Sequence, residues 1–204
     1  MIPAPCRSVG LLALGLLLAA CADAEAFDKL IPERSFTAAS AAMEPTVPLG
    51  SQISADRVEP AQLARGDIVL VRSVRGDVYL SRLIGLPGDT VALAGGRVIL
   101  GGVPALQEPL GPYRLPARDG LPEITAQRLR ETLPGSAASY IILDQRVTPG
   151  DDYGPVALGP DEYFVLGDNR DVAADSRHDP SMNGLGLVKS AQIERRMSAP
   201  ATLP

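Results

Sequence analysis

Short runs of β-branched or alternating apolar residues, separated by Gly and Pro, dominate the chain after position 36. Such runs are typical of half-buried strands, and the Gly and Pro residues between them mark turns. The pattern predicts strands over residues 52–58, 67–74, 78–84, 97–100, 162–166 and, near the C-terminus, 187–193. No period of 20–50 residues recurs, which argues against a repeat architecture. The chain is therefore expected to form an all-β, antiparallel core sheet.

Residues 101–157 differ from this pattern because they are rich in Pro. Within them, residues 123–132 lie between two turn regions and predict one short helix. We interpret the stretch 101–157 as a smaller subdomain inserted into the sheet.

The N-terminus predicts a targeting segment. Arg7 precedes an apolar run over residues 9–20, which is shorter than the roughly 20 residues needed to span a bilayer but is typical of a secretory signal. The run ends in L-A-A-C, which resembles a bacterial lipobox with Cys21 as the lipidated residue. Cleavage after Ala24, or retention of the segment as a membrane anchor, are the alternatives.

The expected layout is a lipoprotein-type signal peptide over 1–21, a tether over 22–36, a folded domain over 37–196 and a tail over 197–204. At 204 residues the chain suits one such domain.

Composition narrows the possible chemistry. A net charge of −5 argues against a nucleic-acid partner, which requires clustered Lys and Arg. Of the two cysteines, Cys6 is discarded with the signal and the thiol of Cys21 is consumed by lipidation, so no thiol remains for a disulfide, a metal site or a nucleophile. We expect no metal and no cofactor. The candidate proton acceptors are also few: two lysines, Lys29 and Lys189, and one histidine, His178.

Three segments carry specific motifs. They read S-A-A-M-E-P-T over residues 40–46, R-G-D-I-V over 65–69 with Y-L-S-R-L-I-G-L-P-G-D over 79–89, and Y-F-V-L-G-D-N-R over 163–170 followed by D-S-R over 175–177. In this order and spacing they resemble the motifs of bacterial signal peptidase I, namely S-x-S-M-x-P-T, R-G-D-[IV]-V with Y-[IV]-K-R-[VI]-I-G-L-P-G-D, and F-V-L-G-D-N-R-D-N-S-x-D-S-R. The resemblance runs from about residue 36 to residue 196. It implies an antiparallel β fold and a serine endopeptidase that processes signal peptides.

The residues that this family uses for catalysis are replaced. The resemblance places the nucleophilic serine at Ala42, the general-base lysine at Ser81 and the serine that hydrogen-bonds the lysine at Ala173. A methyl group cannot attack a carbonyl, and a serine hydroxyl is not a useful base near pH 7. The sequence therefore predicts a degenerate member without an intact catalytic set.

Other positions retain the family residues. Ser40 matches the serine whose hydroxyl donates to the oxyanion, and it could still hold a peptide carbonyl. The resemblance gives Asp168, Asp175 and Arg177 the role of bracing the centre; we interpret them here as a polar scaffold. Charges embedded in apolar strand sequence are tolerated when they are paired, so we expect partners for them. His178 follows Arg177 directly and is the candidate base for a rebuilt serine site.

Three hypotheses follow. The preferred one is an inactive, membrane-tethered signal peptidase I homologue that binds extended peptide or preprotein segments with small residues, facing the periplasm from the bacterial cell envelope. An active paralogous peptidase is a further candidate partner. The alternatives are an active serine endopeptidase with a rearranged site, and a structural envelope lipoprotein.

Overall fold

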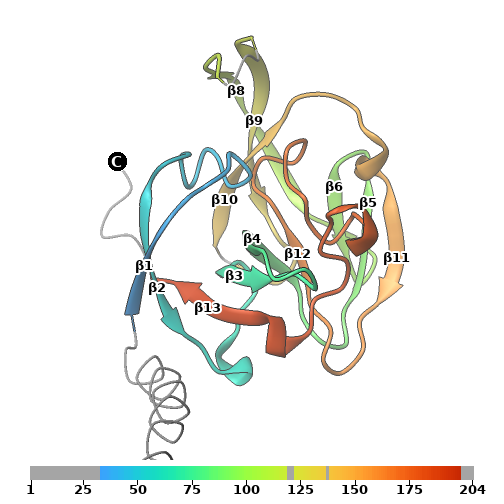
Figure 1. Cartoon of the computed structure of the whole chain (residues 1–204). Helices are drawn as coiled ribbons and strands as arrows, with labels where there is room; N and C mark the ends of the chain where they lie inside the picture. Colours follow the sequence, from blue (N-terminus) through green and yellow to red (C-terminus); the bar gives the residue numbers. More distant parts are fainter. Residues whose placement is uncertain (1–32, 119–121, 137, 199–204) are drawn as a thin grey trace, which may run out of the picture. The chain divides into compact units, whose positions relative to one another are not determined.

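The fold was analysed in a computed structural model that describes residues 33–118, 122–136 and 138–198. From Ser35 onward the described residues belong to one compact unit. Their strands form three sheets joined by turns and short 3₁₀ helices (Figure 1).

The largest sheet has six strands. Their order is β1 (Glu33–Thr37), β2 (Gln52–Arg57), β13 (Ile193–Met197), β3 (Ile68–Arg72), β4 (Val78–Gly85) and β12 (Phe164–Leu166). The pairings from β2 through β12 are antiparallel. The C-terminal strand β13 thus lies between two strands from the first third of the chain.

Two smaller sheets complete the fold. One has the order β11 (Tyr153–Ala157), β5 (Thr90–Ala94), β6 (Arg97–Leu100) and β7 (Val103–Pro104). The other has β9 (Ile124–Thr132) between β10 (Ser139–Asp144) and β8 (Leu106–Leu115). The 3₁₀ helices are η1 (Pro60–Gln62), η2 (Pro149–Asp151), η3 (Pro180–Met182) and η4 (Ser190–Gln192).

Apolar side chains of β4 and β12 pack against β5 and β6 to form one core cluster. Val91 lies opposite Leu100 across the β5–β6 pair, and both are buried on the face that meets Phe164 of β12. The packing is tight at Gly85, where a Cβ atom would come within 2.7 Å of side-chain carbons of Leu158 and Val91. A residue without a side chain is therefore needed where β4 ends.

The all-β, antiparallel fold class is confirmed. The predicted strand over 97–100 coincides with β6, and those over 52–58 and 78–84 differ from β2 and β4 by one residue at the C-terminal end. The strand predicted over 187–193 is wrong in position: β13 begins at Ile193, while Val188 forms only an isolated bridge with Tyr163.

The predicted helix over 123–132 is wrong, because this segment is strand β9. It is the central strand of its sheet, with β8 on one side and β10 on the other. Alignment with two neighbouring strands pairs its backbone groups on both sides and buries Ala126 and Glu131. These non-local pairings outweigh the modest helix propensity of the Ala, Gln, Arg and Leu residues in the segment.

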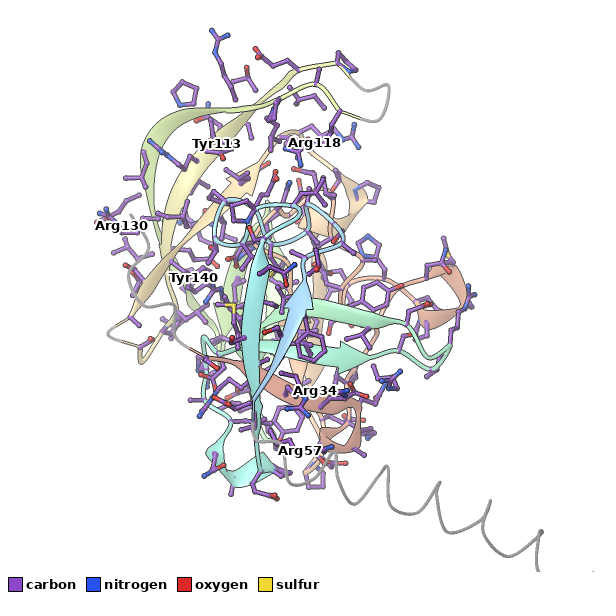
Figure 2. The ribbon with its side chains drawn as sticks, turned by 60° about the vertical axis from the view of Figure 1, so that its left-hand side comes forward. Arg34, Arg57, Tyr113, Arg118, Arg130 and Tyr140 are labelled. Atoms are coloured by element: carbon purple, nitrogen blue, oxygen red, sulfur yellow. The ribbon has the colours of Figure 1, made fainter. Side chains whose placement is uncertain are left out.

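The stretch 101–157 divides between two sheets. Strands β8, β9 and β10 form a sheet of their own, along which Tyr113, Arg118 and Arg130 are seen in Figure 2. Strands β7 and β11, which fall in the same stretch, instead pair with β6 and β5. The boundaries of an inserted subdomain stay a prediction, and only the middle of the stretch forms a separate sheet.

Candidate functional site

A pocket of about 250 Å³ contains the four motif positions that the resemblance matches to the family's catalytic residues. Ser40, Ala42, Ser81 and Ala173 line it together. The other residues that line it are uncharged: Phe36, Thr37, Ala38, Ala39, Met43, Ile53, Leu70, Val78, Tyr79, Leu80 and Ala174. The structure therefore brings together three segments that are far apart in sequence.

Strand β4 places Ser81 in the pocket. Ser81 lies opposite Val69 of β3 and is 3% exposed. Its hydroxyl makes no hydrogen bond to any other described residue, so its donor and acceptor capacity is directed at the pocket. The next residue, Arg82, projects from the opposite face of the strand, as alternation requires.

The loop that carries Ala42 is fixed to the loop after β12. The backbone N–H of Asn169 donates to the Ala42 carbonyl at 3.0 Å, and the Asn169 side-chain amide donates to the Ala41 carbonyl at 3.3 Å. Asn169 is fully buried, which favours these bonds. The Ala42 N–H also donates to the Ser40 hydroxyl at 3.4 Å.

Gly167 permits the close packing of these two loops. A Cβ atom at this position would lie 2.2 Å from the Ala173 Cβ and 2.7 Å from the Ala42 carbonyl oxygen. Both contacts are too short for any side chain. Glycine in the G-D-N-R motif therefore allows Ala42 and Ala173 to approach each other.

Three hydrogen bonds from two residues hold the Asp168 carboxylate. Arg82 donates from Nε and Nη2 to the two carboxylate oxygens, each at 2.7 Å, and the Thr46 hydroxyl donates at 2.5 Å. Both charged side chains are buried, and the Arg82 guanidinium stacks over the Tyr140 ring at 4.2 Å. The ion pair lies directly behind Ser81 and connects β4 to the loop after β12.

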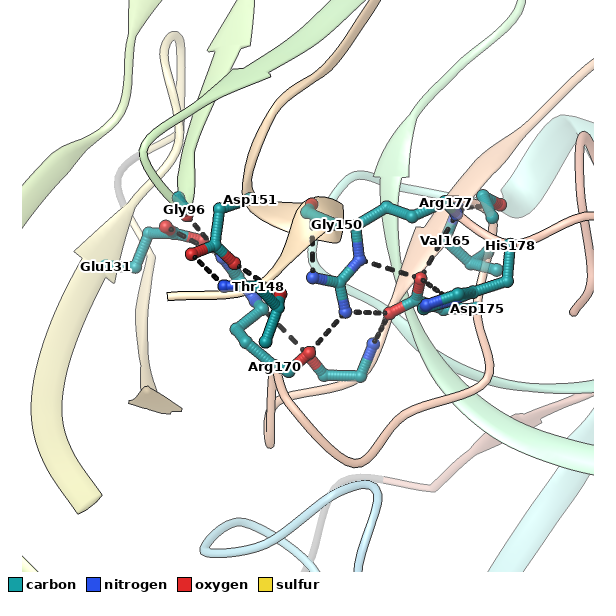
Figure 3. A network of polar contacts seen from close by, with 12 residues as sticks. Gly96, Glu131, Thr148, Gly150, Asp151, Val165, Arg170, Asp175, Arg177 and His178 are labelled. Carbon is teal, nitrogen blue, oxygen red and sulfur yellow. Dashed lines mark hydrogen bonds and ion pairs between the residues drawn. The ribbon is translucent and has the colours of Figure 1, made fainter. Parts of the chain in front are cut away.

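Asp175 and Arg177 form a second buried pair (Figure 3). Arg177 donates to both carboxylate oxygens at 2.9 and 2.8 Å, and the Gly167 N–H donates at 3.1 Å. Burial alone would raise the pKa of Asp175, but hydrogen bonds from His178 and Arg177 and the charge of Arg177 hold that pKa below its usual value. This pair fixes the loop that presents Ala173.

A third buried pair, Arg170 with Glu131, was missed by sequence reasoning (Figure 3). Glu131 is fully buried and also accepts from the Tyr140 hydroxyl at 2.7 Å and from the Gln107 amide at 2.8 Å. Burial tends to raise the pKa of the Glu131 carboxyl, but the charge of Arg170 and these three donors hold it below its usual value. Glu131 was missed because residues 123–132 predict a helix, on which a glutamate would face solvent.

Neither of the two described candidate bases, His178 and Lys189, lines the pocket that contains Ser40 and Ser81. His178 is 47% exposed, lies 3.6 Å from Asp175 and lines a different pocket, of about 500 Å³, from Ser40 and Ser81. Lys189 forms an exposed ion pair with Glu162 at 2.9 Å. Lys29 and Cys21 lie outside the described residues.

Two observations concern ligands and membranes. Within the described ranges, no group of three or more His, Cys, Asp or Glu side chains is placed to hold a metal ion. In the same part of the chain, the structure contains no helix that is long and apolar enough to cross a membrane.

The motifs that line this pocket are matched by a family model. The model for signal peptidase, peptidase S26, matches residues 12–201, which is almost the whole chain. The chain belongs to the signal peptidase S26 family.

Individual relatives agree with this assignment. Signal peptidase I S of Bacillus subtilis strain 168 is 34% identical over 131 residues, or 63% of this chain and 54% of that protein. Signal peptidase IB of Staphylococcus aureus strain COL is 27% identical over 165 residues, or 80% of this chain and 74% of that protein. The chain thus spans about half the length of the Bacillus relatives that it matches.

A solved structure was also compared. The crystal structure of a signal peptidase I from Enterococcus faecalis V583 is 24% identical and covers 67% of this chain and 97% of that one, with a TM-score of 0.38. The family assignment depends on the sequence matches.

The arrangement limits the chemistry that the pocket can perform. Hydrolysis by this family's route needs a nucleophile with a base in hydrogen-bond reach. The pocket offers the methyl groups of Ala42 and Ala173 and the hydroxyls of Ser40 and Ser81. It can therefore bind uncharged groups through apolar contact and hydroxyl hydrogen bonds.

Proposed function

We propose that this chain is a non-catalytic member of the signal peptidase family that binds extended peptide or preprotein segments with small residues. The observation that carries the proposal is that Ala42, Ser81 and Ala173 line one uncharged pocket together with Ser40. The binding site is retained, while a nucleophile and a base are absent from the positions where the family has them.

Among the residues that the structure describes, no substitute base lines the pocket with Ser40 and Ser81, which supports the proposed inactivity. His178 lines a neighbouring pocket that shares Ala173 and Ala174 with the first, and Lys189 is paired with Glu162 at the surface. A serine hydroxyl without a neighbouring base is a weak nucleophile. Neither Ser40 nor Ser81 is therefore activated by a described residue.

The shape and chemistry of the pocket support the binding half. Phe36 and Thr37, at the end of edge strand β1, form part of its wall. An edge strand presents unpaired backbone groups to which an extended peptide can add, and side-chain pockets then provide selectivity. The hydroxyls of Ser40 and Ser81 supply donors for peptide carbonyls, as expected for a site that recognises main chain.

The remaining parts of the proposal concern location and partners. Lipidation at Cys21, or retention of the N-terminal segment, would tether the domain to a bacterial envelope membrane facing the periplasm. There it would meet precursors in transit and an active paralogous peptidase. In this role the protein would hold or shield a precursor without cutting it.

Activity is tested with purified protein that lacks residues 1–21. We expect no labelling by a fluorophosphonate probe and no cleavage of a labelled preprotein or an Ala-x-Ala peptide. Turnover above background that is abolished by Ser40→Ala or His178→Ala would show that the chain is an active serine peptidase.

Binding is tested with the same protein by fluorescence anisotropy. We expect saturable binding of an Ala-x-Ala peptide, which Ala173→Leu should weaken because the added side chain fills the pocket. Val147→Leu is the matched control, because Val147 is 93% exposed and does not line the pocket. Absence of saturable binding by the unmodified protein would refute the binding half of the proposal.

A further inference from the structure

A second apolar pocket, of about 310 Å³, lies on the other side of the loop that carries Ala42. It is bounded by that loop, by the ends of β8 and β9 and by the loop after β12. Its lining residues are Ala39, Ser40, Ala41, Glu44, Leu49, Leu115, Pro116, Arg118, Pro122, Ile124, Gln145, Asn169 and Val172. Of the positions that match the family's catalytic residues, Ser40 lines it, whereas Ala42, Ser81 and Ala173 do not.

The chemistry of this second pocket favours an apolar occupant. Leu49, Ile124 and Val172 line it and are 39%, 37% and 50% exposed, so three large apolar side chains meet solvent at one place. Its two charged lining residues, Glu44 and Arg118, pair with each other at 2.8 Å. Placing an apolar group here removes exposed apolar surface from water and leaves no lining charge unpaired.

The amide groups in the wall are also satisfied. The Gln145 side-chain amide donates to the Asn169 side-chain oxygen at 2.8 Å, and the Asn169 amide donates to the Ala41 carbonyl. Pockets that bind ligands combine an apolar lining with a few fixed polar groups. The second pocket has both properties.

The two pockets share a wall. Ala39 and Ser40 line both, whereas Ala42 lines the first and Ala41 lines the second. Ser40 is exposed at the crest between them. A peptide main chain that crosses this crest can therefore place side chains in both pockets.

We propose that the second pocket binds a bulky apolar side chain of the same extended peptide whose small residues occupy the first pocket. This inference rests on the proposed function. If the chain does not cut the bound peptide, the peptide stays continuous from the first pocket across Ser40 to the second. The ligand class is then an uncleaved segment with two determinants, small residues at one point and a leucine-sized or aromatic residue a few positions away.

The test uses fluorescence anisotropy with the protein lacking residues 1–21 and three sets of labelled peptides. One is an Ala-x-Ala hexapeptide. The second extends it by four residues, at either end, with Leu at two of these positions. The third has extensions of the same length made of Gly and Ser. We expect the Leu extension, at one end, to tighten binding roughly tenfold or more, as burial of a leucine-sized side chain implies.

Variants locate the effect. Ile124→Asp and Leu49→Asp should each remove the gain from the Leu extension and leave the hexapeptide unaffected. Leu106→Asp is the matched control, because Leu106 lies on the same small sheet and is 59% exposed but does not line the pocket. It should keep the full gain.

The possible failures are distinguishable. Equal affinity for the hexapeptide and the Leu-extended peptides would overturn the second site and leave the proposed function intact. A gain that survives both Ile124→Asp and Leu49→Asp would also overturn it. Failure of every peptide to bind would refute the proposed function, and the second site with it.

Discussion

At the scale of single residues, the first pocket differs by a few atoms from the catalytic set that the family resemblance implies. Ala42 and Ala173 each lack one oxygen relative to serine, and Ser81 lacks the amine of a lysine. The surroundings of these positions, namely the bonds from Asn169 and the close packing at Gly167, are those of an ordered site. This order is what makes restoration of chemistry testable.

Restoring activity should require more than one substitution. Ala42→Ser alone supplies a hydroxyl without a base, and Ser81→Lys alone supplies a base without a nucleophile, so both should be inactive. The double variant should cleave weakly: burial at this position lowers the pKa of the new lysine from its free value of about 10.4, so a neutral fraction is available. Adding Ala173→Ser should increase the rate, because its hydroxyl can orient the amine.

The measurement is the cleavage rate of a signal-peptide substrate by the single, double and triple variants. Gains should be strongly non-additive, because the three groups act as a unit. Full activity from Ala42→Ser alone would mean that a base is already in place, contrary to the positions of His178 and Lys189.

At the scale of elements, buried ion pairs connect two of the three sheets to the loop that forms the pocket wall. Arg82 of β4 pairs with Asp168 in the loop after β12. Arg170 of that loop pairs with Glu131 of β9. Tyr140 of β10 touches both pairs, since its ring lies under Arg82 and its hydroxyl donates to Glu131. The small sheet is thus fixed to the loop that forms the pocket wall.

Glu131→Gln should destabilise the fold strongly. It leaves the Arg170 guanidinium buried without its counter-charge, and removal of one partner of a buried pair costs about 3–5 kcal/mol. Glu108→Gln is the matched control on the neighbouring strand, since its pair with Arg130 is about half exposed and should contribute less than about 1 kcal/mol. Urea unfolding measures both. Equal, small effects would show that the Glu131 pair is not a structural anchor.

At the scale of the whole molecule, the free energy of unfolding should decrease at acidic pH. The pKa values of Asp175, Glu131 and Asp89 are all lowered in the folded state; for Asp89 the pKa is lowered, against the effect of burial, by hydrogen bonds from Arg65 and the Leu86 N–H and by the charge of Arg65. A lowered pKa contributes stability that is complete above the unfolded value of about 4 and is lost as the pH falls through the folded value. Burial and the charges of neighbouring aspartates raise the pKa of Asp144. Protonation of Asp144 therefore increases the free energy of unfolding as the pH falls, against the effect of the other three carboxyls.

We therefore expect the free energy of unfolding to be nearly constant from about pH 7 to about pH 5.5 and to fall below about pH 4. Urea midpoints measured across this range test it. Asp175→Asn should be less stable at pH 7 and should show a shallower loss on acidification. A midpoint that rises between pH 5 and pH 3 would contradict the prediction.

The proposed membrane attachment is tested separately from the fold. If Cys21 is the lipid site, Cys21→Ala should leave unlipidated precursor and move the protein to a different fraction of the cell. Metabolic labelling with a fatty acid analogue measures this directly. Label that persists in Cys21→Ala would refute the lipobox interpretation, and cleavage after Ala24 or an uncleaved anchor would then account for the N-terminus.

The sequence by itself determined the family, the fold class and the residue types at positions 42, 81 and 173, which are alanine, serine and alanine. These properties are local, because a motif is a fixed order of residues and a methyl group has no reactivity in any fold. Strands such as β6 were predictable for the same reason, since alternation and flanking glycines are visible in the chain.

Only the tertiary structure decided the partner of Arg170, the strand character of residues 124–132 and the second pocket beside Ser40. Each of these depends on contacts between distant segments. The pairing of β9 with β8 and β10 overrides a local preference for helix, and the burial that follows turns Glu131 into the counter-charge of Arg170. Local helix propensities differ by fractions of a kcal/mol per residue, whereas breaking a buried charge pair costs several kcal/mol. Long-range contacts therefore determine the strand at residues 124–132 and the partner of Arg170.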